Sequence, residues 1–243
     1  MKLNCDLGES FGAWQMGLDK EVMPHIDMAN IACGFHGGDS DVMANTLKLA
    51  KQHKVLIGAH PSYPDRQGFG RRSMALTAQE LSNCLHYQIA AIEGMAKVQG
   101  LTLEYVKPHG ALYNDMMVDE TLLTTVMQAV ASYPSALKLM ILASANAEQH
   151  QQLAQQYQLE LILEAFADRQ YTDEGLLVSR KMAGSVHDKP ALIAQVKQLL
   201  ATGCVTTRSG KQLPLHADSL CVHGDNAAGI ALIAEIKALC HSN

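Results

Sequence analysis

Short apolar runs of strand length alternate along this chain with longer stretches of helical periodicity. The runs are mostly continuous rather than alternating with polar residues, as expected of parallel strands buried on both faces. We predict seven strands, at Lys2–Asp6, Met28–Cys33, Val55–Ala59, Leu103–Lys107, Lys138–Ala143, Glu160–Glu164 and Ser219–His223. This repetition predicts an α/β fold whose parallel sheet closes into a barrel, with an open, doubly wound sheet as the alternative.

The intervening helices have recognisable start and stop signals. Thr77-Ala-Gln-Glu80 has the pattern of a capping box, and Gly100 suits the left-handed residue that follows a helix. We expect five further helices, starting at Asp39, Asp119, Asn146, Asp188 and Asn226 and ending near His53, Tyr133, Gln158, Gly203 and Cys240.

Three segments depart from the alternation. Ser62–Ser73 and Arg169–His187 are long connections, which in compact domains are often functional. Thr206–Pro214, with Ser209-Gly210 at its centre, has the pattern of a small hairpin. Because no repeat or linker divides the chain, we predict a single domain over residues 1–243.

Composition argues against two classes of protein. A formal net charge of −5 and a pI of about 6.1 are unlike a nucleic-acid-binding surface. No apolar run approaches the ~18 residues of a membrane helix. None of the six cysteines forms a C-x-x-C pair and no export signal opens the sequence, so we expect a cytoplasmic protein that contacts neither nucleic acid nor membrane.

Ionisable and polar residues gather where the predicted strands end. In chain order they are Asn4, Asp6, Glu9; His36, Asp39; His60, Tyr63, Asp65, Arg71, Arg72; Lys107, His109, Tyr113; Glu164, Asp168, Arg169, Tyr171; and His223, Asp225, Asn226. In a parallel barrel the loops after the strands share one face, where catalytic groups converge. We therefore predict one pocket built from residues far apart in sequence.

Simpler interpretations exist for some of these residues. Asp39 and Asn226 suit helix caps, and Arg71 and Arg72 suit a solvated loop pair. Four histidines, His36, His60, His109 and His223, share one topological position, which packing alone does not explain. With Asp6 they offer imidazole and carboxylate ligands for zinc, iron or manganese, and we take Asp6, His36 and His60 as the candidate metal set. The H-E-x-x-H pattern is absent.

A glycine-rich turn suggests an anion site. Cys33-Gly-Phe-His-Gly-Gly38 leads into a predicted helix start, where backbone N–H groups can hold an anion or oxyanion. Glycine also serves simply to make tight turns. The sequence contains no G-x-x-x-x-G-K-[ST] phosphate loop. Gly68-Phe-Gly70 starts like the dinucleotide-binding motif G-x-G-x-x-G, but position 73, where the third glycine would stand, is serine.

Six ordered motifs resemble the LamB/YcsF family, from about Lys2 to about Leu239. They are Leu3-Asn-Cys-Asp-Leu-Gly-Glu9, Asn30-Ile-Ala-Cys-Gly-Phe-His36, Gly58-Ala-His-Pro-Ser-Tyr-Pro-Asp65, Val106-Lys-Pro-His-Gly-Ala-Leu-Tyr113, Glu164-Ala-Phe-Ala-Asp-Arg169 and Cys221-Val-His-Gly-Asp-Asn226. The family pattern usually has alanine where this chain has Gly37.

The resemblance implies a distorted (β/α)7 TIM-like barrel of the glycoside hydrolase/deacetylase type. It also implies ATP-dependent hydrolytic ring opening of 5-oxo-L-proline to L-glutamate, with release of ADP and phosphate. This reaction implies ATP with Mg²⁺ as cofactor and two partner subunits, PxpB and PxpC. A homo-oligomer and a further divalent metal are left open.

Roles follow as hypotheses from this chemistry. Catalytic roles fall to Asp6, Glu9, His36, His60, Lys107 and His109. The two carboxylates would hold metal or act as base, and the histidines would transfer protons or stabilise the developing oxyanion. Lys107 would lie near phosphate or the substrate carboxylate. Contacts to substrate or phosphate fall to Asn4, Gly37, Arg71, Arg72, Tyr113, Glu164, Arg169, His223 and Asp225. Two alternatives are a metal-dependent deacetylase or amide hydrolase that uses no ATP, and a non-catalytic component that delivers substrate.

Overall fold

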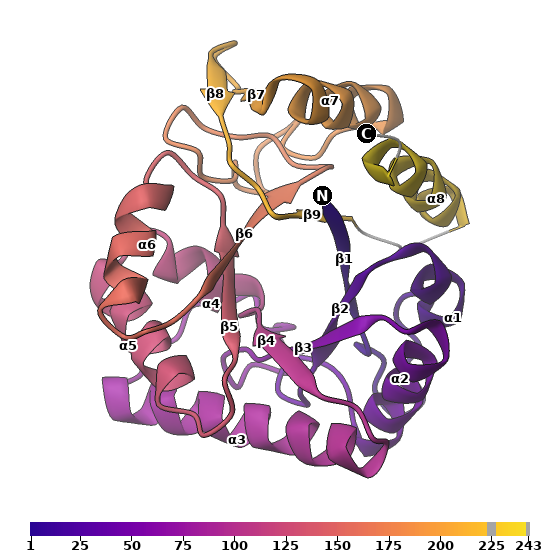
Figure 1. Cartoon of the computed structure of the whole chain (residues 1–243), viewed down its shortest axis with the longest axis vertical. Helices are drawn as coiled ribbons and strands as arrows, with labels where there is room; N and C mark the ends of the chain where they lie inside the picture. Colours follow the sequence, from indigo (N-terminus) through magenta and orange to yellow (C-terminus); the bar gives the residue numbers. More distant parts are fainter. Residues whose placement is uncertain (223–226, 242–243) are drawn as a thin grey trace.

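Seven parallel strands form a closed barrel in the computed structural model, which describes residues 1–222 and 227–241. Around the ring the strands are β1 (Lys2–Leu7), β2 (Met28–Ala32), β3 (Leu56–His60), β4 (Leu103–Val106), β5 (Lys138–Leu142), β6 (Leu161–Phe166) and β9 (Ser219–Cys221). Figure 1 looks down this ring and shows the helices outside it. All seven predicted strands and the closed barrel are therefore confirmed, and the open sheet is excluded.

Closure depends on β9, which lies between β6 and β1. Asn4 is in register with Cys221 on one side, and Glu164 is in register with Ser219 on the other. The strand ends at Cys221, so the predicted end at His223 lies outside the described residues. Because β9 joins both ends of the chain's sheet, residues from β1 and β6 meet inside the barrel.

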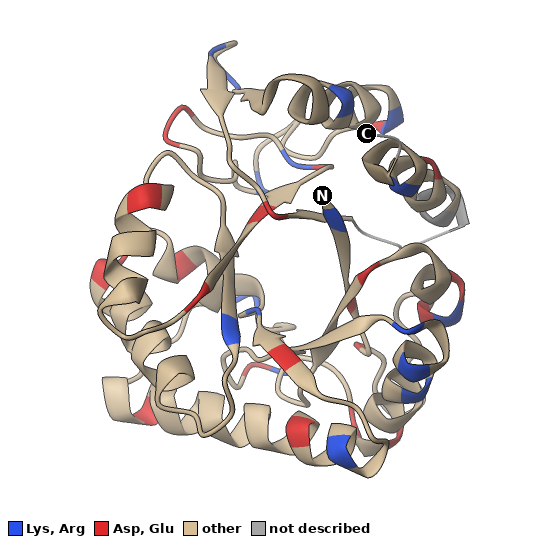
Figure 2. Cartoon of the chain, viewed as in Figure 1, with Lys and Arg blue, Asp and Glu red and all other residues tan. Residues whose placement is uncertain are grey.

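Helices cover the outside of the ring. They are α1 (Asp19–Val22), η1 (Met23–His25), α2 (Ser40–His53), α3 (Ala78–Val98), α4 (Gly110–Met116), α5 (Glu120–Ala131), α6 (Ala147–Gln155), α7 (Lys189–Thr202) and α8 (Ala227–His241). Charged residues of both signs are scattered over these outer helices (Figure 2). None of the helices in the described part of the chain is long and apolar enough to span a membrane.

Most of the predicted capping signals are present. Asn146 makes no side-chain hydrogen bond at the start of α6, and Asn226 lies outside the described residues. Thr77 and Glu80 form the reciprocal capping box of α3, and Gly100 follows that helix with φ of +70°. The side chains of Asp39, Asp119 and Asp188 accept hydrogen bonds from the first turns of α2, α5 and α7. The helix signals in the sequence thus act locally, as their spacing predicts.

The structure adds elements that the sequence pattern did not indicate. The helices α1, η1 and α4 are short, and so they carry too little periodicity to stand out. The helix α4 begins at Gly110, directly after His109, and turns the chain sharply at the end of β4. The predicted hairpin is confirmed as β7 (Cys204–Thr206) paired antiparallel with β8 (Gln212–Pro214).

The barrel interior contains buried polar side chains beside apolar ones. The main apolar core lies between strands and helices, whereas a separate small cluster contains Met28, Tyr105 and Met140. Alternate strand residues face opposite sides of the sheet, and on the same side as this small cluster lie polar residues that are at most 1% exposed: Asn4, Asn30, Lys107, Glu164 and Ser219. A site is therefore built into the centre of the barrel.

Candidate active site

Lys107 is the centre of a buried ionic cluster inside the barrel. Its Nζ lies 2.9 Å from Oδ1 of Asp6 and 2.8 Å from Oε1 of Glu164, and the residue is 1% exposed. Burial opposes the charge on this amine, but the attraction of Asp6, Cys221 and Glu164 outweighs it and holds the pKa of Lys107 well above its usual value. The ammonium ion therefore stays charged and binds β1 to β6 across the barrel.

A chain of hydrogen bonds fixes Asp6 from the other side. Asn30 Nδ2 donates to Asp6 Oδ1 at 2.8 Å and to Asn4 Oδ1 at 2.7 Å. Tyr105 donates its hydroxyl to Asn30 Oδ1 at 2.6 Å, and Gly58 leaves the room that the Tyr105 ring occupies. Asp6 is thus held in one orientation as a carboxylate.

Tyr113 fixes the second carboxylate of the cluster. Its hydroxyl donates to Oε2 of Glu164 at 2.8 Å. Burial and the neighbouring Glu164 raise the pKa of Tyr113 well above its usual value, so the phenol remains a donor.

Three buried imidazoles lie beside this cluster, each at a strand end. His60 ends β3, His36 follows β2, and His109 precedes α4. The rings of His36 and His109 stack with centroids 3.7 Å apart and an interplanar angle of 4°. Oε1 of Glu9 lies 3.3 Å from Nε2 of His36 and 3.6 Å from Nδ1 of His109. Four residues that the sequence placed at the strand ends are thus brought together.

The hydrogen positions on two of these rings follow from their carbonyl partners. Nδ1 of His60 lies 2.7 Å from the carbonyl oxygen of Lys107, and Nε2 of His109 lies 2.9 Å from that of Phe69. Carbonyl oxygens only accept, so both of these nitrogens carry hydrogen. The other two nitrogens, His60 Nε2 and His109 Nδ1, then face each other with lone pairs at 2.9 Å. Such an arrangement requires a proton or a cation between them.

The donor set suits a transition metal ion. One ligand atom each from Glu9, His36, His60 and His109 lies within 4.8 Å of the others. Imidazole-rich sites favour zinc, iron or manganese over Mg²⁺, which prefers oxygen ligands. Burial and the neighbouring histidines lower the pKa of His36 and of His109, which favours the neutral ring that binds metal. Beside the predicted His36 and His60, this set contains Glu9 and His109, while Asp6 Oδ2 lies 3.4 Å from His60 Nε2.

Gly70 lets the backbone approach the imidazoles. Its φ is +64°, and a Cβ there would lie 2.8 Å from Cδ2 of His109 and 2.9 Å from Cβ of His36. This close passage brings the Phe69 carbonyl to His109.

A cavity of about 550 Å³ opens over both clusters. Of the residues predicted from sequence, its lining includes Asp6, Glu9, His60, Arg71, Lys107, His109, Tyr113 and Arg169. Asn4, His36 and Glu164 are buried and contact lining residues through the bonds described above. His223 and Asp225 lie outside the described residues.

Three residues that we predicted to contact substrate or phosphate bond to other groups of the chain instead. Two of these residues are arginines. Arg72 pairs with Asp65 and is not among the lining residues. Arg169 donates to the carbonyl oxygens of Val178 and Ser185 within its own connection.

Gly37 is the third of these predicted contacts, and it belongs to the glycine-rich turn. Backbone N–H groups of this turn donate to carbonyl oxygens of the chain itself. Gly38 donates its N–H to the carbonyl of Ser10, and Gly34 donates to that of Gly37. A Cβ at Gly37 would lie 2.8 Å from the carbonyl oxygen of Glu9, so this glycine allows the turn to pack against the loop that carries Glu9.

Sequence reasoning missed the interior residues that orient the site. Asn30, Tyr105, Ser219 and Cys221 contact the ionic cluster or its hydrogen-bond chain. A signal was present for Asn30, because it is a lone amide in the middle of an apolar strand. Sequence reasoning also missed Arg180 and Lys181, which lie in the cavity lining.

Comparison with known proteins identifies the family of this chain. Relatives named as the A component of 5-oxoprolinase are 53% identical over 236 residues in Pseudomonas putida, covering 97% of this chain and 92% of the relative, and 51% identical over 239 residues in Vibrio cholerae, covering 98% and 96%. The crystal structure of a lactam utilization protein from Thermus thermophilus superposes with a TM-score of 0.90 at 35% identity, covering 100% of this chain and 96% of that one. The model of the LamB/YcsF family matches residues 1–243. The chain, a (β/α)7 TIM-like barrel, therefore belongs to the LamB/YcsF family.

Proposed function

We propose that this chain carries the lactam site of an ATP-dependent 5-oxoprolinase, which opens 5-oxo-L-proline to L-glutamate and releases ADP and phosphate. The observation that carries the proposal is the convergence of Asp6, Lys107, Glu9 and two histidines, His60 and His109, at one end of a single cavity. The names of the relatives supply the substrate class.

The chemistry of the reaction matches these groups. Transfer of the γ-phosphoryl group to the lactam carbonyl oxygen makes the carbonyl carbon electrophilic. Water adds to that carbon, and the C–N bond breaks as the nitrogen takes a proton. A second water hydrolyses the resulting acyl phosphate to the carboxylate and phosphate. The site must therefore accept a proton from water and deliver one to nitrogen.

Each proton transfer has a candidate group in the site. Glu9 is partly exposed to the cavity and lies next to two imidazoles, so it is placed to take the proton from water. When a proton lies between His60 Nε2 and His109 Nδ1, which are 2.9 Å apart, His109 is placed to deliver that proton to the ring nitrogen. Lys107 holds Asp6 ionised and contributes positive charge where negative charge develops on oxygen.

The ligand set Glu9, His36, His60 and His109 would hold a divalent transition metal, with Asp6 beside it. Such an ion would supply Lewis-acid polarisation of the lactam carbonyl. Mg²⁺ would accompany ATP as its counter-ion.

Partner subunits complete the proposal. The relatives are named as one lettered component of 5-oxoprolinase, which implies that other components exist. We propose that these other components are PxpB and PxpC, the two subunits that the family resemblance implies.

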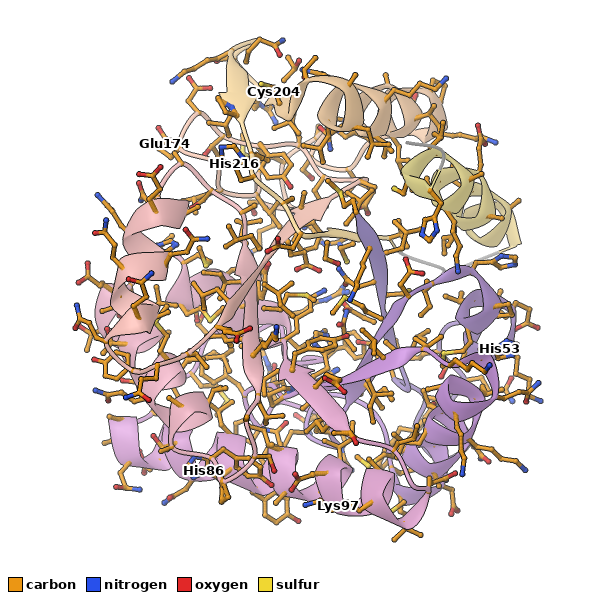
Figure 3. All side chains as sticks on the ribbon, in the orientation of Figure 1. His53, His86, Lys97, Glu174, Cys204 and His216 are labelled. Carbon is orange, nitrogen blue, oxygen red and sulfur yellow. The ribbon has the colours of Figure 1, made fainter. Side chains whose placement is uncertain are left out.

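The test is a reconstitution with the two partner subunits, ATP and 5-oxoproline. Glutamate and ADP should form in equal amounts, and omission of this chain should stop both. Glu9→Gln should lower turnover by ~10²–10⁴-fold, whereas Glu174→Gln, at the periphery of the molecule in Figure 3, should not. Wild-type rates with Glu9→Gln would refute the assignment.

The histidine cluster also favours a second candidate, a metal-dependent amide hydrolase that needs no ATP. This enzyme would release glutamate from 5-oxoproline with added zinc or manganese and no nucleotide. The same assay without ATP separates the two candidates.

A further inference from the structure

The cavity above Lys107 is much larger than a five-membered lactam requires. Its volume of about 550 Å³ falls within the ~300–1,000 Å³ of sites that enclose drug-sized ligands. The groups assigned to the lactam, Asp6, Glu9, His60, Lys107 and His109, form only one part of the lining. The remaining lining, which we call the outer part, needs a separate explanation.

The outer part combines apolar side chains with cations. It contains Met117, Val118, Leu142, Phe166, Leu176, Leu177, Arg71, Arg180 and Lys181. An apolar wall beside three positive charges suits a ligand that has a flat apolar end and a polyanionic end. A free lactam, with one carboxylate, matches neither the size nor the charge of this region.

The distribution of arginine supports an anion site here. The chain has a net charge of −5, yet five of its six arginines lie in the two long connections that follow β3 and β6: Arg66, Arg71, Arg72, Arg169 and Arg180. Arginine binds phosphate groups through two parallel hydrogen bonds. Arg71 and Arg180 are exposed and line the cavity, so their guanidinium groups are accessible to a ligand.

Buried polar groups hold the β6–α7 connection in place as one wall of this cavity. Arg169, 6% exposed, donates to the carbonyl oxygen of Val178 at 2.6 Å. Gln195 of α7 donates to the carbonyl oxygens of Phe166 and Arg169, each at 2.9 Å. Arg169 is therefore a positioning residue, and Arg180 and Lys181 are the cations that this wall presents.

We propose that the outer part of the cavity binds the nucleoside triphosphate on this chain itself. Arg71, Arg180 and Lys181 hold the phosphates, and the base packs against Val118 and Leu177. The γ-phosphate then points to the inner end of the same cavity, where the lactam lies. The inference rests on the proposed function for the identity of the reaction, and it adds which polypeptide holds the nucleotide.

Two pairs of variants test the two halves of the ligand. The double variant Arg180→Glu, Lys181→Glu reverses the cations, and Lys48→Glu, Lys197→Glu is its control, because these two lysines are exposed and outside the lining. Val118→Asn alters the apolar wall without adding a charge, and Val98→Asn is its control. Val118 and Val98 are 70% and 87% exposed, so neither variant should unfold the chain.

Calorimetric titration of the isolated chain compares MgATP with magnesium triphosphate. We expect MgATP to bind more tightly than triphosphate. Reversal of the cations should weaken both ligands by about tenfold or more, because one charge-assisted hydrogen bond contributes about this factor. Val118→Asn should weaken MgATP only, and both controls should bind like the wild type. Equal affinity for MgATP and triphosphate would overturn the assignment of the base to the apolar wall.

The same variants in the reconstituted mixture of all three proteins separate this inference from the proposed function. Reversal of the cations should raise the KM for ATP by about tenfold. One outcome would overturn the inference alone: 5-oxoproline is turned over, but the isolated chain binds no nucleotide and the variants leave the KM for ATP unchanged. The nucleotide then lies on PxpB or PxpC, and the proposed function still stands. If MgATP binds as described but no glutamate forms, the nucleotide site stands and the proposed reaction fails.

Discussion

The two polar clusters of this barrel lie side by side, but only one of them is internally satisfied. Around Lys107, an ammonium ion meets two carboxylates, and amide and phenol donors take up other oxygens of the cluster. Around His60 and His109, two lone pairs face each other at 2.9 Å, and Oε1 of Glu9 lies within 3.6 Å of His109. The first cluster has donors for its acceptors, whereas the second has an excess of acceptors.

This difference in hydrogen-bond satisfaction suggests different functional roles for the two clusters. A satisfied ionic cluster has one stable arrangement, so it fixes Asp6 and the field inside the barrel. A cluster of acceptors gains stability from a proton or a cation, so it is suited to bind one and to exchange it. We infer that chemistry occurs at the histidines, and that the Lys107 cluster orients the groups around them.

The largest effect should come from breaking the satisfied cluster. Lys107→Met keeps an unbranched side chain that is one atom shorter, and it leaves the partly buried Asp6 and the buried Glu164 without their cation. Removing one partner of a buried ion pair costs about 3–5 kcal/mol. We expect a loss of this size in the free energy of unfolding, measured with urea, together with loss of turnover.

Lys97→Met is the matched control for this loss. Lys97 pairs with Glu93 on the surface of α3, at the periphery in Figure 3. Its removal should cost less than ~1 kcal/mol. Equal losses for the two lysines would mean that the Lys107 cluster does not hold the barrel together.

The histidine cluster should respond in activity rather than stability. His109→Gln removes the nitrogen that faces His60 but keeps a polar side chain for the carbonyl of Phe69. Turnover should fall by ~10²–10⁴-fold, with an unfolding midpoint close to that of the wild type. His53→Gln, on α2 at the edge of the molecule in Figure 3, should leave both unchanged. A large loss of stability in His109→Gln would place this histidine with the structural cluster instead.

A metal titration tests whether the histidine cluster, with its excess of hydrogen-bond acceptors, binds a cation. The chain freed of metal by a chelator should gain ~2.7 kcal/mol in unfolding free energy at a zinc concentration of 100 times Kd, as measured by thermal unfolding. His36→Gln should lose most of this gain, and His86→Gln, an outer histidine on α3, should keep it. No gain in the wild type would favour a shared proton between His60 and His109.

The barrel and the meeting of the strand ends were predictable because their signals are local. Each strand is a continuous apolar run, and topology alone places His36, His60 and His109 at one end of the barrel. The set of acceptors around them was only partly predictable. His109 joins the set because α4 begins at the next residue and because Gly70 has a left-handed conformation, and neither feature has a periodic pattern.

The arginines show the other limit of sequence reasoning. Arg72 and Arg169 follow strands, as residues that bind phosphate do, but a guanidinium can reach partners several residues away in its own loop. Arg72 pairs with Asp65, and Arg169 donates to Val178. Only the folded connection shows that Arg180 and Lys181 also line the cavity there, beside Arg169.

The smallest effect should come from one hydrogen bond within the satisfied cluster. Tyr113→Phe removes the phenol that donates to Glu164, and Tyr133→Phe removes an equivalent bond to Glu93, 2.9 Å long, on the outside of the barrel. Each should cost about 1 kcal/mol in unfolding free energy. Only Tyr113→Phe should also lower turnover, because Tyr113 lines the cavity and orients the carboxylate that pairs with Lys107. If both variants turn over like the wild type, the Lys107 cluster tolerates a missing donor and its role is limited to stability.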